Sequence, residues 1–162
     1  GNSNPKFVGG LGLNIKYKQV MLTTNFYARL GQKIINGARM DMEGMRGTSN
    51  QSTAVLNRWR TEGDDTDIPR ALYGMGYNYL GSDRFVEDAS FLRLKNLMIS
   101  YSLPQRLIER NRVFSGVRFY VQGQNLLTFT KFSGLDPEGT SNIYAAQYPM
   151  ARQYTFGIDI TF

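Results

Sequence analysis

The sequence predicts an all-β fold in which five antiparallel strands form part of a transmembrane β-barrel. Three observations support this prediction: five segments alternate apolar and polar side chains, the connections between them alternate between short and long, and the chain is rich in Tyr, Phe and Gly. Alternation with a period of two residues is typical of a strand with one apolar and one polar face. No apolar run is longer than four residues, which excludes a membrane-spanning helix.

The first two strands are expected at residues 6–18 and 20–31. In the first, the odd positions from Phe7 to Tyr17 are apolar or glycine, and the even positions are mostly small or polar. In the second, the even positions from Val20 onward form the apolar face. Only Lys18-Gln19 separates the two segments, so they are predicted to form a tight hairpin.

The third strand is expected at residues 85–103 and contains a change of face. Its apolar side chains occupy odd positions from residue 97 onward, whereas Leu92 and Leu94 have the opposite parity. Two explanations are open: a β-bulge near Lys95-Asn96 shifts the face, or the upper part of the strand rises clear of its apolar surroundings.

The last two strands are expected at residues 116–127 and 153–162. The final segment has the cleanest alternation, with one face formed by Tyr154, Phe156, Ile158, Ile160 and Phe162. Two long connections remain, at about 32–84 and 128–152, and the first could contain a short helix within residues 51–60. Connections of such length are usually functional or disordered.

The alternating connection lengths favour a membrane barrel over a soluble β-sandwich, which stays open as the alternative on pattern alone. In a barrel the apolar face meets lipid, and long extracellular loops alternate with short periplasmic turns. In a sandwich the apolar faces pack on each other. The barrel hypothesis places the Lys18-Gln19 hairpin and residues 104–115 on the periplasmic side. It also predicts one exposed surface formed by Leu11, Leu13, Leu22, Phe26, Ile99, Tyr101, Phe119, Val121, Phe156 and Ile158.

Five strands cannot close a membrane barrel, since the smallest barrels have eight. Open strand edges in lipid would leave backbone N–H and C=O groups without partners. We therefore expect the 162 residues to be a piece of a larger barrel. Each strand should pair with the next, the first and last should be edges, and we expect no parallel pair and no helix between Pro5 and Gln32.

A series of motifs in the second half of the chain resembles the C-terminal barrel segment of the SusC/RagA-like TonB-linked outer-membrane transporters. The motifs are SDRFVEDASFLRLKNL at 82–97, SYSLP at 100–104, VQGQNLLTFT at 121–130, GLDPE at 134–138, YP at 148–149 and YTFG at 154–157. Upstream, Trp59 followed by Gly63-Asp64, Thr66-Asp67 and Pro69-Arg70 is similar to the long-loop signature of the family. The resemblance covers the chain from about residue 5 to its end.

The resemblance implies a barrel of about 22 strands that holds a plug. It also implies coupling to TonB through a region upstream of this segment and a SusD-like surface lipoprotein that covers the barrel as a lid. Insertion would use the barrel assembly machinery of the Gram-negative outer membrane. The implied function is active import of oligomeric nutrients, glycan or peptide, without a cofactor; the alternative is a non-energised barrel, either a porin or an adhesin.

Candidate functional residues fall into four groups. The resemblance implies that Tyr154, Phe156, Ile158, Ile160 and Phe162 form a barrel-assembly signal, although a last strand can simply end in Phe. Substrate or lid contacts are Trp59, Tyr73, Tyr77 and Tyr79, which could instead pack within the loops. Weak metal candidates are Asp64, Asp65 and Asp67, which are more simply solvated loop carboxylates. A basic rim of Lys16, Lys18, Arg106, Arg110 and Arg112 could meet lipid phosphates or remain hydrated.

Other classes of function have little support in this sequence. The formal charge of +6 raises nucleic-acid binding, but the basic residues are spread along strands and turns instead of forming one stripe. Histidine and cysteine are absent, which removes the commonest catalytic base and thiol nucleophile. We therefore expect neither an enzyme nor a nucleic-acid-binding protein.

Overall fold

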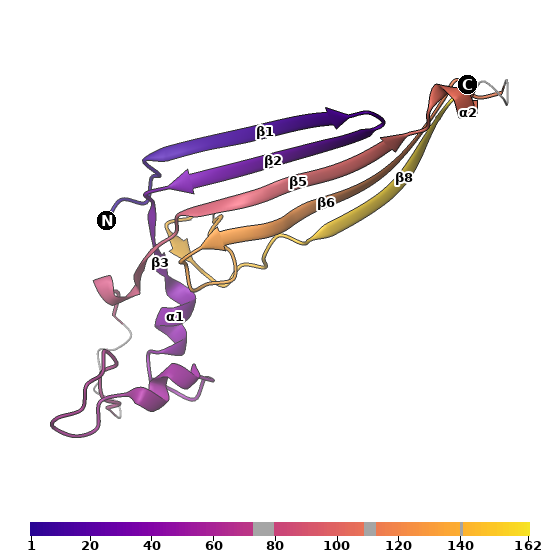
Figure 1. Ribbon diagram of the computed structural model, residues 1–162. Coiled ribbons are helices and arrows are strands. Elements are labelled where there is room, and N and C mark those ends of the chain that lie inside the picture. Colours follow the sequence, from indigo (N-terminus) through magenta and orange to yellow (C-terminus); the bar gives the residue numbers. More distant parts are fainter. Residues whose placement is uncertain (73–79, 109–112, 140) are drawn as a thin grey trace.

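The computed structural model describes residues 1–162 apart from 73–79, 109–112 and 140. Its main element is a five-stranded antiparallel sheet with the strand order β1-β2-β5-β6-β8, which twists along its length (Figure 1). The strands are β1 Phe7–Tyr17, β2 Val20–Leu30, β5 Phe91–Ser102, β6 Gly116–Thr130 and β8 Gln153–Thr161. The predicted sheet of five sequentially paired antiparallel strands is confirmed, with β1 and β8 as its edges.

The two ends of the sheet differ in their connections. At one end, called here the hairpin end, Lys18 adopts a positive φ of 52° in the tight turn between β1 and β2, and Ser102 N–H donates to Gln19 O over 2.9 Å. The short helix α2, Gln105–Ile108, lies at the same end (Figure 1). The two long connections leave from the opposite end, called here the loop end. No helix in the described part of the chain has the length and apolar character needed to cross a membrane.

The prediction of one continuous strand over residues 85–103 is wrong in its first part. Residues Asp83–Phe85 form a 3₁₀ turn (η2), and Val86–Asp88 form β4, which belongs to another sheet. The break is caused by a local turn, in which the Asp88 carboxylate accepts hydrogen bonds from the Ser90 N–H at 2.9 Å and from its hydroxyl. The chain therefore changes direction at Ala89, which is completely buried.

Of the two explanations for the change of face, the β-bulge near Lys95-Asn96 is the one that the structure shows. The register pairs Phe26 with Leu94 and Asn25 with Asn96, so Lys95 is the extra residue in β5. A further extra residue follows in β6, where Asn125 adopts a positive φ of 52°. The first bulge returns Leu92 and Leu94 to the same face as Ile99.

The connections contain more regular structure than the sequence predicts. The first holds β3 Lys33–Asn36, helix α1 Gly37–Met42 and the 3₁₀ helix η1 Thr53–Asn57, whose N-cap is Ser52. The second holds β7 Ile143–Tyr144. Strands β4, β3 and β7 form a small sheet in which β3 and β7 are parallel, which contradicts our expectation of no parallel pair. Parallel pairing is possible here because β3 and β7 come from different connections and meet only beyond the main sheet.

A compact apolar core lies under the small sheet, at the loop end. It consists of Ile34, Ala89, Phe132 and Tyr144. The rings of Phe132 and Tyr144 meet edge to face with centroids 5.1 Å apart, and the Tyr144 hydroxyl accepts a hydrogen bond from Leu135 N–H at 3.0 Å. Gly134 lies against both rings, where no Cβ would fit. The second connection is therefore closely packed just after it leaves β6.

One face of the main sheet is apolar and exposed, as the barrel hypothesis requires. A row of directly opposed side chains crosses all five strands: Ile15, Leu22, Ile99, Val121 and Phe156. Eight of the ten predicted residues are exposed, with relative accessibilities between 43% and 76%. Leu22 and Phe26 are half-buried because large side chains flank them on both neighbouring strands. No second layer covers this face in the described part of the chain, so the two-layer sandwich is excluded.

The opposite face, called here the inner face, is polar at its centre. The Gln122 amide donates to the Asn96 amide oxygen at 2.8 Å, and Arg118 pairs with Asp159 between β6 and β8. Tyr120 is directly opposed to Gly157, and its ring occupies the space that a side chain at Gly157 would need. The tyrosine therefore covers a bare stretch of β8 and favours one register of the last strand.

This packing predicts the effect of Gly157→Ala. The added methyl group would displace the Tyr120 ring, and we expect the free energy of unfolding to fall by about 1 kcal/mol, the scale of a good cross-strand pair. In a Tyr120→Ala background the same substitution should have almost no effect, because the colliding ring is gone. Urea unfolding of the complete protein in detergent micelles measures both.

The matched control is Gly116→Ala in the same strand pair, where a Cβ would lie 3.5 Å from Thr161 Oγ1, an ordinary contact. Equal effects of Gly157→Ala in the two backgrounds would show that Tyr120 does not fix this position.

Candidate functional site

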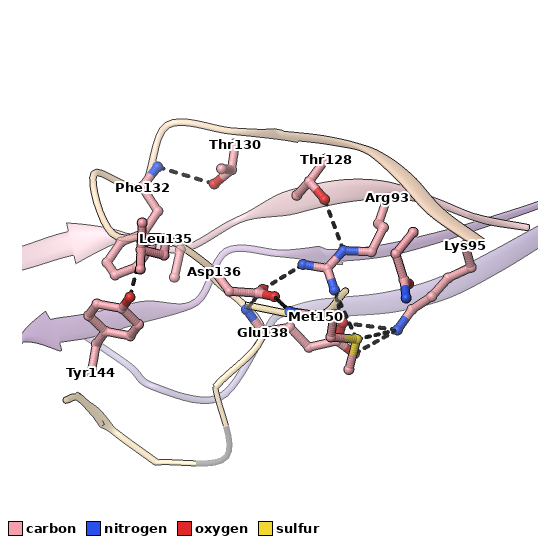
Figure 2. Close-up of polar contacts among 12 residues, drawn as sticks. Arg93, Lys95, Thr128, Thr130, Phe132, Leu135, Asp136, Glu138, Tyr144 and Met150 are labelled. Carbon is pink, nitrogen blue, oxygen red and sulfur yellow. Dashed lines mark hydrogen bonds and ion pairs between the residues drawn. The ribbon is translucent and has the colours of Figure 1, made fainter. Parts of the chain in front are cut away.

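Two groups of charged side chains hold the long connections against the loop end of the sheet. The first group, called here the Arg93 joint, consists of Arg93, Lys95, Thr128, Asp136 and Glu138 (Figure 2). Arg93 and Lys95 project from β5 on the inner face, and the two carboxylates come from the second connection. The joint thus connects the FLRLKNL motif of β5 to the GLDPE motif about forty residues later.

The Arg93 guanidinium is almost fully buried, with its side chain only 3% exposed. Its three nitrogens each donate to a different partner: Nε to Thr128 Oγ1 at 3.0 Å, Nη1 to Glu138 Oε2 at 2.8 Å and Nη2 to Asp136 Oδ1 at 2.5 Å. Lys95 Nζ lies 2.9 Å from the same Glu138 oxygen. A planar donor with this spread of N–H groups can hold two carboxylates in a fixed arrangement.

Asp136 also organises the backbone of its own connection. Its two carboxylate oxygens accept hydrogen bonds from the N–H groups of Glu138 at 2.9 Å and Met150 at 3.2 Å. Burial raises the pKa of Asp136, but the Glu138 N–H, the Arg93 guanidinium and the Met150 N–H together lower it more, so the net pKa lies below the ordinary value. The carboxylate is therefore charged at neutral pH.

The second group, called here the Glu87 joint, links the two long connections to each other. It consists of Asn36, Arg39, Glu43, Arg84, Glu87 and Ser133. Glu87 on β4 accepts from Ser133 N–H at 2.9 Å and from the Asn36 amide at 3.2 Å, and it pairs with Arg39 at 3.2 Å. Arg39 on α1 also pairs with Glu43 at 2.7 Å. Glu43 in turn pairs with Arg84, at 2.6 Å.

The charge states in the Glu87 joint follow from these contacts. Burial raises the pKa of Glu87, but the Ser133 N–H and hydroxyl, Arg39 and Asn36 lower it further than burial raises it. The pKa of Arg39 is raised, first by its hydrogen bond to Glu43. Glu87 is therefore charged at neutral pH, and the side chains of both joints pair with one another and hold the connections to the sheet.

Trp59 lies in the first connection, two residues after the 3₁₀ helix η1. Its N–H donates to Ile68 O at 2.8 Å, and the Arg70 guanidinium lies 5.9 Å from the ring centroid. A shallow hollow surrounds the ring and is lined by Thr66, Asp67 and Pro69 as well. One aromatic ring next to a carboxylate and a guanidinium is suited to contact with a polar chain molecule.

The three loop aspartates do not converge. The Asp64 carboxylate accepts from the N–H groups of Arg60 at 2.7 Å and Thr61 at 2.9 Å, so it closes a local turn. Its pKa is lowered first by the Thr61 N–H and then by the Arg60 N–H. Asp65 and Asp67 are exposed. In the ranges that the structure describes, no three acidic residues are grouped as a metal site would need.

The other predicted residues are distributed as follows. Tyr73, Tyr77 and Tyr79 lie outside the described residues, as do Arg110 and Arg112 of the basic rim. Lys16 and Lys18 lie at the hairpin end, where Arg106 is also found on α2. On β8, side chains from Tyr154 to Phe162 at every second position are between 48% and 82% exposed. The Phe162 ring packs against Phe114 with centroids 5.5 Å apart.

Sequence reasoning missed both joints as sites. Arg93, Glu87, Asp136 and Glu138 stand within the quoted motifs, but a motif does not show which of its charges will meet. The available signal was the parity of Arg93: once Lys95 is taken as a bulge, Arg93 moves from the apolar to the inner face and needs an acidic partner.

A curved sheet with one exposed apolar face, one polar face, two unpaired edges and anchored long connections has the form of a segment of a transmembrane β-barrel. Comparison with known proteins agrees. No protein-family model matches the chain. The chain is 32% identical over its full length to the TonB-dependent receptor P3 of Formosa agariphila, of which it spans 17%. Over 59% of its length it is 37% identical to the TonB-dependent receptor SusC of Bacteroides thetaiotaomicron, of which it covers 9%.

Solved structures give the same result. The chain superposes on the RagAB peptide importer in its open-open state with a TM-score of 0.87 at 36% identity, covering 99% of this chain and 17% of that one. The closed-closed state matches with a TM-score of 0.87 at 35% identity, covering 99% of this chain and 18% of that one. The chain is homologous to a segment of the SusC/RagA-like TonB-dependent outer-membrane receptors, as its motifs indicated. These relatives are transporters and receptors, not enzymes.

The burial of Arg93 predicts a large effect for Arg93→Ala. Removing one partner of a buried ion pair leaves the other charge without compensation, which costs about 3–5 kcal/mol. We expect the second connection to detach locally, so that proteolytic cleavage within residues 131–152 of the complete protein accelerates by roughly a hundredfold to a few thousandfold. Arg118→Ala is the control: that pair is 47% exposed on both sides and should contribute at most about 1 kcal/mol.

A variant in which all three charged side chains are replaced by neutral ones of similar shape shows whether the penalty comes from leaving a buried charge unpaired. In Arg93→Met with Asp136→Asn and Glu138→Gln, no buried charge is left alone, and much of the protection should return. Similar cleavage in Arg93→Ala and Arg118→Ala would show that the joint does not hold the connection.

The lowered pKa of Asp136 predicts acid release of the second connection. A carboxylate whose pKa is lower in the folded state stabilises that state fully above the unfolded value, near 3.8, and this stabilisation is lost as pH falls through the folded pKa. The anisotropy of a fluorophore on Leu135→Cys, an exposed position, should therefore be constant from neutral pH to about 4 and fall below it. In Asp136→Asn the fall should be smaller, and release between pH 5 and 7 would contradict the assignment.

Proposed function

We propose that this chain is part of the barrel wall of a TonB-dependent active importer in the outer membrane, which takes up oligomeric nutrients, glycan or peptide. The observation that supports this most strongly is the superposition of nearly the whole chain on the RagAB peptide importer at 36% identity. The complete receptor would be a plugged barrel of about 22 strands. It would work with a SusD-like lipoprotein at its mouth and receive energy through TonB.

The faces of the sheet define its orientation in this proposal. The exposed apolar rows meet lipid, and the polar inner face meets the plug and the lumen. The hairpin end lies on the periplasmic side, and both long connections, residues 31–90 between β2 and β5 and residues 131–152 between β6 and β8, are extracellular loops. The Arg93 and Glu87 joints support this placement because they secure the connections where these leave the sheet.

The open edges of the sheet require further strands. In lipid, the outward N–H and C=O groups of β1 and β8 would cost several kcal/mol each without partners. We propose that the rest of the barrel pairs with both edges and that the barrel assembly machinery recognises β8 through Tyr154, Phe156, Ile158, Ile160 and Phe162. The exposed backbone edge of β8 suits recognition by strand addition.

Cargo and lid contacts are proposed on the extracellular loops. Trp59 with its hollow is the described candidate, and Tyr73, Tyr77 and Tyr79 belong to the same loop. The joints are excluded from this role because their carboxylates and guanidiniums already satisfy one another. Selectivity between glycan and peptide would then depend on aromatic contacts together with the plug and the lid.

The test is energised uptake by cells that carry the complete receptor. Accumulation of a labelled oligosaccharide or oligopeptide should require the receptor and stop when TonB is deleted or the proton gradient is dissipated. Uptake that persists without TonB would identify a passive porin, and cell adherence without uptake would identify an adhesin. A receptor from which the SusD-like lipoprotein cannot be co-purified would contradict the proposed partnership.

A further inference from the structure

The apolar face of the sheet is hollowed near the loop end. This upper hollow has a volume of about 400 Å³, and its walls are Phe7, Leu11, Phe26 and Leu92 around the small residues Gly9 and Ala28. It lies over β1, β2 and β5, on the same face as the exposed apolar rows.

The hollow follows from the register of the strands. Gly9 is opposed to Ala28, and Ala28 to Leu92, so two small residues stand side by side in one row. The next row toward the hairpin end contains Leu11 and Phe26, and the next row toward the loop end contains Phe7 and Leu30. The Phe7 ring leans over Gly9, where an added Cβ would lie 2.8 Å from it, so the hollow is enclosed by this ring together with Leu11, Phe26 and Leu92, and its lining is mostly apolar.

Positive charge lies beyond the hollow at the loop end. Lys131 follows β6 directly, next to the row that contains Phe129 and Leu92, and Lys33 begins β3. Both lysines act on Asp88, whose pKa is lowered first by its Ser90 hydrogen bonds and also by these two cations. Two lysines therefore lie close enough to the Asp88 carboxylate to act on it, and that carboxylate is also bound to Ser90.

We propose that the upper hollow is a lipid site, which holds one acyl chain of lipid A, the phosphorylated glycolipid of the outer leaflet, while Lys33 and Lys131 meet its phosphate groups. The proposal rests on the proposed function, because that places this face in lipid and the loop end outside. An apolar gap below a basic rim matches a ligand whose acyl chains lie below its phosphates. Ordinary boundary lipid would require neither the gap nor the charge.

A second copy of this chain fits the hollow less well. A symmetric contact centred on this patch would bring the lysine rims of both copies together, and like charges oppose such a contact. The same face has a lower hollow of about 470 Å³ around Ile99, Val121 and Phe156, closer to the hairpin end. Its position away from Lys33 and Lys131 makes it the internal control.

The test uses the complete receptor, extracted in mild detergent and examined by native mass spectrometry for co-purified lipid A. Ala28→Leu fills the upper hollow with apolar volume and should abolish retention. Val121→Phe fills the lower hollow in the same way and should leave retention unchanged. Lys33→Gln with Lys131→Gln should lower the apparent affinity for added lipid A about tenfold and leave the sheet untouched.

Each possible result has a defined meaning. Absence of lipid A from the wild-type receptor, equal retention by Ala28→Leu, or a phospholipid in its place would overturn the proposal, and so would unchanged affinity in the double lysine variant. Heat-modifiable mobility checks that Ala28→Leu is folded; if it is not, the lysine variant decides. Cargo uptake is measured in the same strains, so a failure of the importer assignment is seen separately from a failure to bind lipid A.

Discussion

The structure depends first on the need of every backbone N–H and C=O group for a hydrogen-bond partner. The main sheet meets this need between its strands, with antiparallel pairing from β1 to β8 that is interrupted at the bulges, and its two outer edges have no partner strand in the described part of the chain. A water-soluble sheet could leave its edges to solvent, but a sheet whose apolar face is turned to lipid cannot. The lipid environment that we propose therefore explains the exposed apolar rows through Ile99 and Phe156, and it also requires partner strands at the open edges.

The main sheet was predictable from the sequence because its face pattern is local. From Leu11 to Leu13, or from Phe156 to Ile158, the side-chain period alone indicates a strand and its apolar face. The small sheet and the break at Ala89 were not predictable in this way. β3 and β7 have four and two residues, too few for a period, and they pair through a tertiary contact between distant connections. The capping of the Ser90 N–H by the Asp88 carboxylate is visible only once the chain has turned.

Charged side chains have different roles at the two ends of the sheet. At the loop end, the carboxylates of Glu87, Asp136 and Glu138 are paired with guanidiniums from β5 and α1. These carboxylates are largely shielded from water, so the pairs stabilise the structure. Closer to the hairpin end, the exposed pair Arg118–Asp159 lies on a face that also carries the neutral Asn96 and Gln122. Separating a buried ion pair costs more free energy than separating an exposed one, so a buried pair holds its geometry. The connections are thus fixed where they leave the sheet, while the inner face nearer the hairpin end carries an exposed ion pair and neutral polar side chains.

The bulges connect these two environments. If β5 continued without its extra residue, the odd parity of Ile99 would place Arg93 on the apolar face, and Leu92 and Leu94 would point inward. The unpaired Lys95 reverses this, so that Leu94 opposes Phe26 on the apolar face and Arg93 reaches Asp136 on the other. β6 follows with Asn125, whose left-handed backbone is tolerated by Asn and whose amide donates to Ala151 O in the second connection. One inserted residue per strand therefore keeps a guanidinium off the exposed apolar face and supplies the charge that binds the second connection, so the apolar face and the anchored connections are set by the same irregularity.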